Sequence, residues 1–267
     1  MRIESLAQRG MTMIHRIAHF LPGFAGLLLI MGSAAASNGG DVKNGKLVYE
    51  RYCLSCHGAQ GNGQGEAAEW LSIKPRDYRQ GTYKWRTTPS GSLPLDSDLE
   101  HTLENGLYGT YMPTWRAIDE RSRIDVIAYI KTFSPRFATE KPQDPITIPP
   151  DPGYSDESVK RGAATYQKYN CSQCHGSGGQ GDGPSAHELK DDWGNAIVPY
   201  DLTKGHVKCG DKSTDIYRVF MAGLSGTPMP TFADSLNSTD AWDLVHFIES
   251  LSPGYAKVYA GTSGAHP

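Results

Sequence analysis

Cys53-Leu54-Ser55-Cys56-His57 and Cys171-Ser172-Gln173-Cys174-His175 are two copies of one short pattern, Cys-x-x-Cys-His. The pattern is the attachment signal for c-type haem. Two thiols three positions apart each reach a vinyl group of one porphyrin, and the adjacent imidazole then faces the iron. A zinc site needs further ligands at short range, and a thioredoxin-like redox pair does not need the histidine. The sequence therefore predicts two covalent haems c, attached through Cys53, Cys56, Cys171 and Cys174, with His57 and His175 as iron ligands.

A second repeated segment follows each of these motifs. Gly109-Thr110-Tyr111-Met112-Pro113-Thr114-Trp115 matches Gly226-Thr227-Pro228-Met229-Pro230-Thr231-Phe232, and the two methionines follow their histidines by 55 and 54 residues. A lone loop methionine usually fills a gap in a core. A thioether is also a soft ligand that favours ferrous iron, and the following proline fixes the backbone that carries it. Because the segment recurs at the same distance from both motifs, we expect Met112 and Met229 to be the sixth iron ligands.

The first 36 residues have the pattern of a secretory signal peptide. Three arginines precede an apolar run at 20–31, which ends in Ser33-Ala34-Ala35-Ala36, and cleavage is expected after Ala36. The run is short for a membrane span, so an uncleaved anchor is the less favoured alternative. Export suits the cysteines, because haem is attached to this motif on the far side of the membrane. The predicted location is the periplasm.

The charge balance narrows the choice of partners. Without residues 1–36 the chain has 23 basic and 28 acidic residues, a formal charge of −5. A mildly acidic chain without a basic patch is not expected to bind nucleic acid. We expect it to meet redox proteins through charge steering or apolar contacts.

The order of segments indicates a duplicated module. A helix, the haem motif, a glycine-rich loop, the methionine loop and a final helix recur with a period near 118 residues. The expected division is a signal peptide at 1–36, domain 1 at 37–138, a linker at 139–153, domain 2 at 154–258 and a tail at 259–267. Five prolines predict an extended, stiff linker. A length of 267 residues suits two domains of ordinary size.

The local patterns are helical throughout. Helices are expected over 41–52 and 162–169 before the haem motifs, over 120–133 and 239–251 at the domain ends, and before each methionine loop. For the helix before the first methionine loop, Ser97 or Asp98 is the expected N-cap and Gly106 the stop; Ser213 and Gly223 bracket its counterpart at 215–222. No useful alternating β pattern occurs, so the predicted fold class is all-α. The glycine-rich runs 58–65 and 176–183 lack the Lys-Ser/Thr ending of a phosphate loop and are expected to pack against the haem edge.

The chain resembles the dihaem class I c-type cytochromes, with two mitochondrial-cytochrome-like domains in tandem. The resemblance covers about residues 40–135 and 155–253 and is carried by the haem motif and the Met-Pro loop in both copies. It implies that the first and last helices of each domain cross through a glycine and an aromatic residue, Gly45 with Tyr129 and Gly162 with Phe247.

The resemblance also implies residues around the haem. A proline carbonyl in this family accepts a hydrogen bond from the iron-ligating histidine, and Pro75 and Pro199 are the candidates. Arg76, Trp85 and Arg86 are candidates to bind a haem propionate. The alternative interpretation of these three residues is an exposed basic loop.

Cys209 is the one cysteine outside the haem motifs. It is either a small buried or unused thiol, or a ligand of the second iron in place of Met229. The second interpretation would resemble thiosulfate dehydrogenases, which have a His/Cys haem beside another haem. The intact methionine motif favours the first. Four histidines are alternative iron ligands, but none recurs in both copies: His101, His187, His206 and His246.

These ligands predict electron transfer rather than catalysis. An iron held by histidine and methionine has no vacant position for oxygen, peroxide or nitrite. We therefore expect a periplasmic electron carrier that moves single electrons between a donor and an acceptor protein. Two alternatives are a dihaem enzyme, such as a peroxidase or a thiosulfate dehydrogenase-like protein using Cys209, and a permanent cytochrome subunit of a membrane or molybdenum oxidoreductase complex.

Overall fold

The computed structural model describes residues 39–205, 208, 210 and 212–253, which all belong to one compact unit. Over these residues the regular elements are helices and there is no strand, although isolated bridges occur, among them one between Lys190 and Ala196. The predicted all-α fold is therefore confirmed. The predicted signal peptide, His206, Cys209 and the tail lie outside the described residues. No helix within the described part is long and apolar enough to cross a membrane.

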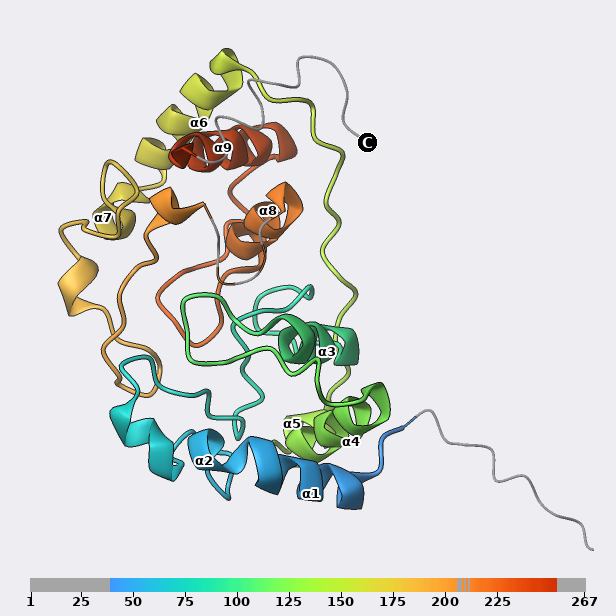
Figure 1. Ribbon diagram of the computed structural model, residues 1–267. Helices are drawn as coiled ribbons and strands as arrows, with labels where there is room; N and C mark the ends of the chain where they lie inside the picture. Colours follow the sequence, from blue (N-terminus) through green and yellow to red (C-terminus); the bar gives the residue numbers. More distant parts are fainter. Residues whose placement is uncertain (1–38, 206–207, 209, 211, 254–267) are drawn as a thin grey trace, which may run out of the picture. The chain divides into compact units, whose positions relative to one another are not determined.

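The same order of elements occurs twice along the chain (Figure 1). The first set is α1 (Val42–Tyr52), α2 (Leu54–His57), the 3-10 helix η1 (Glu66–Trp70), α3 (Asp96–Asn105), α4 (Glu120–Lys131) and α5 (Arg136–Thr139). The second set is α6 (Asp156–Lys168), α7 (Ser172–His175), the 3-10 helices η2 (Ala186–Glu188) and η3 (Leu202–Lys204), α8 (Ser213–Ala222) and α9 (Ser238–Ser250).

Each domain is built on a close crossing of its first and last helices. A Cβ atom placed on Gly45 of α1 would run into the backbone carbonyl of Asp125 in α4 and lie 3.0 Å from Cβ of Tyr129. A Cβ atom on Gly162 of α6 would meet the carbonyl of Asp243 in α9 and lie 2.8 Å from Cβ of Phe247. Only glycine permits this approach of two backbones. The two pairs implied by the family resemblance therefore lie at the crossings.

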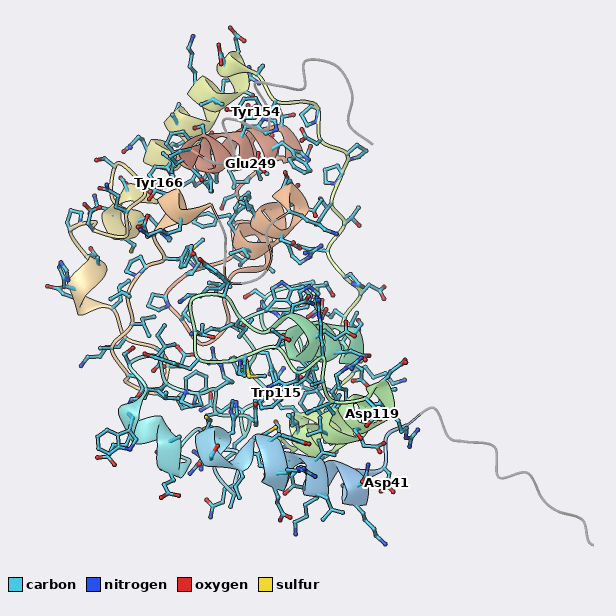
Figure 2. All side chains as sticks on the ribbon, in the orientation of Figure 1. Asp41, Trp115, Asp119, Tyr154, Tyr166 and Glu249 are labelled. Atoms are coloured by element: carbon cyan, nitrogen blue, oxygen red, sulfur yellow. The ribbon has the colours of Figure 1, made fainter. Side chains whose placement is uncertain are left out.

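Apolar residues of these helices form a separate core in each domain, and Figure 2 shows the side chains that project between the helices. The first core contains Tyr49 from α1, Leu99 from α3 and Val126 from α4. The second contains Tyr166 from α6, Phe220 from α8 and Val245 from α9. Two cores of one kind are what a duplicated module should produce.

Two helix starts differ from the sequence-based expectation. Helix α3 begins at Asp96 rather than after Ser97 or Asp98, because the Asp98 carboxylate reaches back and accepts a hydrogen bond from the Leu95 amide at 2.9 Å. Helix α6 begins at Asp156, six residues before the expected start. The Ser155 hydroxyl caps it by accepting from the Ser158 amide at 3.0 Å.

The proline-rich linker is extended, as expected, and is also hydrogen-bonded to both domains. The Ile146 amide donates to the Thr87 carbonyl at 2.8 Å in the first domain. The Trp242 indole Nε1 donates to the Pro149 carbonyl at 3.1 Å in the second. These two bonds therefore tie the linker to both domains.

Candidate haem sites

The two cysteines of each motif are set by a single helical turn. In the first domain α1 ends at Tyr52, and the His57 amide donates to the Cys53 carbonyl at 2.9 Å, so α2 brings both thiols and the imidazole to one side. The same bond joins His175 to Cys171 at 2.9 Å in α7. This local geometry is what attachment of one porphyrin through two thioethers requires.

A tyrosine hydroxyl anchors the end of each motif. Tyr49 donates to the Gly58 carbonyl and Tyr166 donates to the Gly176 carbonyl, both at 2.7 Å. Both tyrosines are buried, at 1% exposure. The sequence analysis missed this pair, although a tyrosine four or five residues before the first cysteine of each motif was a usable signal.

Each motif histidine is oriented by a main-chain carbonyl. His57 Nδ1 donates to the Arg76 carbonyl at 3.1 Å, and His175 Nδ1 donates to the Tyr200 carbonyl at 3.2 Å. A carbonyl only accepts, so the proton sits on Nδ1 and Nε2 keeps its lone pair for a metal. Burial lowers the pKa of His57 to about 4 and also lowers the pKa of His175, which favours the neutral, ligating form.

The prediction that the carbonyls of Pro75 and Pro199 accept the histidine hydrogen bonds was wrong, because the acceptor is in each case the next residue in the chain. These carbonyls face the glycine-rich loops instead. A Cβ atom on Gly63 would lie 2.5 Å from the Pro75 oxygen, and one on Gly181 would lie 2.7 Å from the Pro199 oxygen. Because successive carbonyls of an extended chain point in opposite directions, packing the proline against the loop turns the next carbonyl toward the histidine.

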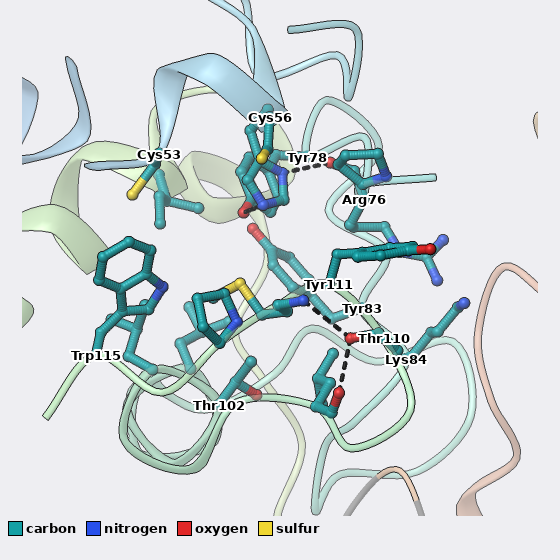
Figure 3. Close-up of a pocket in the computed structure, with 18 of the residues that line it drawn as sticks. Cys53, Cys56, Arg76, Tyr78, Tyr83, Lys84, Thr102, Thr110, Tyr111 and Trp115 are labelled. Carbon is teal, nitrogen blue, oxygen red and sulfur yellow. Dashed lines mark hydrogen bonds between the residues drawn. The ribbon is translucent and has the colours of Figure 1, made fainter. Parts of the chain in front are cut away.

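A largely apolar pocket opens beside the first motif (Figure 3). Cys53, Cys56, His57 and Met112 all line it, so the structure brings the predicted thiols and both predicted iron ligands to one cavity. The Tyr78 hydroxyl lies 3.0 Å from His57 Nε2, and iron ligation requires this hydroxyl to move aside. Side chains from α3, α4 and the loops complete the lining, among them Leu99, Leu103, Leu107, Ile127 and Ile130.

The methionine loops have the same internal bonding in both domains. Thr110 Oγ1 donates to the Leu107 carbonyl at 2.7 Å and accepts from the Met112 amide at 3.1 Å. Thr227 Oγ1 donates to Leu224 at 2.7 Å and accepts from Met229 at 3.2 Å. The repeated Gly-Thr-x-Met string thus encodes one rigid turn that holds the methionine backbone.

Unpartnered buried donors test whether a haem suits the first pocket. The Tyr83 hydroxyl and the Trp85 indole Nε1 are buried and have no hydrogen-bond partner among the described residues. Both residues line the pocket. A buried donor without an acceptor is costly, and a haem propionate would supply the acceptor. The residues present therefore fit a haem.

The second site repeats this pattern in part. Cys171 and Met229 pack against the second core. The Trp193 Nε1 and the Tyr200 hydroxyl are again buried donors without a partner among the described residues. Two of the histidines considered as alternative iron ligands have other partners. His101 stacks on Trp85 with ring centroids 4.0 Å apart. His246 hydrogen-bonds Ser158 and Asp151.

The exposed-loop interpretation of the propionate candidates is wrong for Arg86 and Trp85, which are 2% and 8% exposed. Trp85 and Arg76 line the first pocket. Arg86 does not, and its guanidinium donates to main-chain carbonyls of the second domain, Ala222 at 2.7 Å and Gly223 at 3.5 Å.

Comparisons with known proteins agree with this geometry. The family model described as "Cytochrome c" matches residues 42–134 and again 159–252. Among solved structures, the chain is similar to a chain of the Kuenenia stuttgartiensis reducing HAO-like protein complex Kustc0457/Kustc0458, with 40% sequence identity and a TM-score of 0.78. The match covers 79% of this chain and 97% of that chain. A comparison with curated proteins found no match.

Two haem motifs, two methionine loops and two matches to one family model therefore lead to a single identification. The chain belongs to the cytochrome c family and is a dihaem c-type cytochrome with two cytochrome c domains in tandem.

Proposed function

We propose that the protein transfers single electrons through two haems c, each held by a histidine and a methionine, as the cytochrome partner of an oxidoreductase complex. The first haem would be attached to Cys53 and Cys56 with His57 and Met112 as iron ligands. The second would be attached to Cys171 and Cys174 with His175 and Met229. A haem c supplies a reversible one-electron change of its iron.

The observation that carries this proposal is the exact recurrence of both ligand supports. In each domain the histidine Nδ1 is tied to a main-chain carbonyl, and the methionine backbone is tied to a threonine two residues earlier. Ligands fixed on both sides of an iron resist replacement, which favours electron transfer over binding of a substrate at the metal.

The apolar lining of the first pocket supports the same function. The side chains that line the pocket with His57 and Met112 are mostly apolar. An apolar environment disfavours the extra positive charge of ferric iron, as does a thioether ligand. We therefore propose that the first centre has a raised reduction potential.

The partner is proposed from the relative of known structure. That chain is part of an HAO-like protein complex, and this chain matches nearly its whole length at 40% identity. We propose an oxidoreductase complex of that kind as the electron donor or acceptor, and the periplasm as the place of contact. Co-purification of the tagged native protein, analysed by mass spectrometry, should recover an oxidoreductase with it; recovery of the cytochrome alone would contradict the stable complex.

Redox titration of variants tests the ligands. Met112→Leu and Met229→Leu remove only the sulfur at nearly constant volume, so each should abolish one of two high-potential steps. Met221→Leu, in α8 of the second domain, is the matched control and should leave both steps in place. Two steps that survive both substitutions would overturn the ligand assignment. Loss of the second step in Cys209→Ser, with Met229→Leu silent, would instead identify a His/Cys haem.

A further inference from the structure

Two arginines of the first domain reach across to the methionine loop of the second. Arg86 is 2% exposed, and its Nη2 donates to the Ala222 carbonyl at 2.7 Å at the end of α8. Its Nε donates to the Pro89 carbonyl at 3.1 Å within the first domain. The guanidinium therefore joins the main chains of both domains.

Arg76 makes a second bond to the same segment. Its Nη2 donates to the Ser225 carbonyl at 3.3 Å, and its guanidinium carbon lies 4.4 Å from the centre of the Trp193 ring. A Cβ atom on Gly226 would collide with Nη1 of Arg76 and lie 2.7 Å from the Trp193 ring. The loop backbone is thus packed closely against a cation that is itself held by an aromatic face.

The residues whose carbonyls accept these bonds lie shortly before Met229, the predicted iron ligand, in the chain: Ala222, Gly223 and Ser225. Gly223 ends α8, and the Leu224 amide donates to the Met229 carbonyl at 3.1 Å, which closes the loop on itself. Fixing the carbonyls of Ala222 and Ser225 therefore fixes the start of the closed turn that carries Met229. The bond from Arg86 to Ala222, at 2.7 Å, has the short length of a charge-assisted hydrogen bond, whereas the bonds to Ser225 and Gly223, at 3.3 and 3.5 Å, are longer.

The Met112 loop contacts the described part of the second domain through aromatic packing. The Met112 loop meets the second domain through Tyr200, whose ring lies 6.4 Å from that of Tyr108 and 3.2 Å from a Cβ atom placed on Gly109. Ring packing restrains a loop less sharply in direction than donors aimed at two carbonyls. The two methionine loops therefore depend unequally on the neighbouring domain.

We propose that Arg76 and Arg86 are positioning residues for Met229, so that methionine ligation of the second haem depends on contacts from the first domain. The proposal rests on the proposed function, because it takes Met229 as an iron ligand. The two arginines act through the main chain of residues 222–225 and do not touch the iron.

Lysine substitutions separate the effect of the directed guanidinium donors from the effect of the positive charge. Arg86→Lys and Arg76→Lys keep the positive charge, but an ammonium group cannot reproduce the planar set of donors that a guanidinium directs at several carbonyls. The control is Arg79→Lys, because among the described residues the Arg79 side chain bonds Asp77, at 2.7 Å, within the first domain. Trp193→Leu removes the aromatic partner of Arg76 without changing either arginine.

The experiment is a spectroscopic redox titration of the whole haem-loaded protein, together with carbon monoxide binding to its ferrous form. In the double variant Arg76→Lys/Arg86→Lys we expect the step lost in Met229→Leu to shift by at least tenfold in its equilibrium, about 59 mV for one electron. Carbon monoxide should then bind at one haem. Trp193→Leu should shift the same step in the same direction, by less.

The Met112 step serves as the internal test of folding in Arg86→Lys, Trp193→Leu and Arg79→Lys, where it should stay within threefold of its original equilibrium, because none of these three residues lines the first pocket. An unchanged Met229 step and no carbon monoxide binding in the double variant would overturn the positioning role. An equal response to Arg79→Lys would also overturn it, since any lysine substitution would then suffice. A silent Met229→Leu variant would instead contradict the ligand assignment of the proposed function.

Discussion

Arg76 and Tyr200 occupy equivalent positions in the two domains and face both haem sites at once. Each accepts, through its main-chain carbonyl, the Nδ1 hydrogen bond of its own motif histidine. Each also directs its side chain onto the methionine loop of the other domain, Arg76 onto Ser225 and Tyr200 onto Gly109. One residue in each domain therefore links the motif histidine of its own domain to the methionine loop of the other domain.

Tyr200→Leu should have a smaller effect than the arginine substitutions. The substitution keeps the main-chain carbonyl that orients His175 and removes both the ring packed against Tyr108 and Gly109 and the buried hydroxyl of the second site. We expect the Met112 step to shift by less than about threefold, which is about 30 mV for one electron. Redox titration measures this shift, and a displacement larger than that of the Met229 step in Arg86→Lys would contradict the unequal dependence of the two loops.

Trp85→Phe should lower the potential of the first haem. The indole Nε1 is buried in the pocket wall without a partner among the described residues, and we assign it to a propionate. Without this donor the propionate charge is less compensated, which favours ferric iron. We expect a fall of about 30 mV in the Met112 step, about threefold in its equilibrium, and no change in the other step.

Trp70→Phe is the control for this experiment. Trp70 is 81% exposed and should change neither potential when substituted. Equal shifts in the Trp70 and Trp85 variants would show that the indole Nε1 of Trp85 does not bind a propionate.

Gly45→Ala and Gly162→Ala should each destabilise their own domain. The new methyl group would overlap the carbonyl of Asp125 or Asp243, so the crossing helices must separate. We expect a loss of about 1–3 kcal/mol in the free energy of unfolding, measured by urea denaturation. Gly39→Ala is the control, because nothing lies within 4 Å of a Cβ atom placed there. A cost at Gly39 equal to that at Gly45 would argue against the overlap as the cause.

Asp119→Ala should lower stability at neutral pH but not in acid. The Asp119 carboxylate caps α4 by accepting from the Ser122 amide at 2.9 Å, and this backbone hydrogen bond lowers the pKa of Asp119. A lowered folded pKa gives stability that is present above the unfolded value, about 3.9, and is lost as the pH falls through the folded value. Denaturation curves of the variant and the native protein should therefore converge on acidification.

Asp119→Asn separates the cap from the charge. Asparagine keeps an acceptor oxygen for the helix end, so most stability at neutral pH should remain. Its curve should lack the acid-dependent loss that the native carboxylate contributes. If the native protein and Asp119→Asn lose stability in parallel, the carboxyl group is not the source of the pH dependence.

The haem motifs, the duplication and the helix crossings could be predicted because each depends on residues whose spacing is set by covalent chemistry or by helix geometry. Cys53 and Cys56 belong to one helical turn. The family resemblance implied that the first and last helices of the domain cross, and this paired Gly45 with Tyr129. The proline after each methionine indicated a fixed loop backbone, but the hydrogen bonds of Thr110 and Thr227 were not predicted.

The remaining features depend on tertiary packing that local sequence does not encode. The histidine acceptor moved from Pro75 to Arg76 because the Pro75 carbonyl is turned toward Gly63. Arg86 resembled a surface or propionate-binding residue until the second domain supplied its carbonyl partners. Asp98 looked like an N-cap but lies one turn later, at the position from which it reaches back to Leu95.

The doubly fixed linker has a consequence for association with other proteins. Its bonds from Ile146 to Thr87 and from Trp242 to Pro149 mean that the chain presents a preorganised pair of electron-transfer modules. A partner protein does not have to immobilise one domain relative to the other, so little of the binding energy is lost to ordering the two domains. More of that energy would then remain to stabilise the proposed complex with an oxidoreductase.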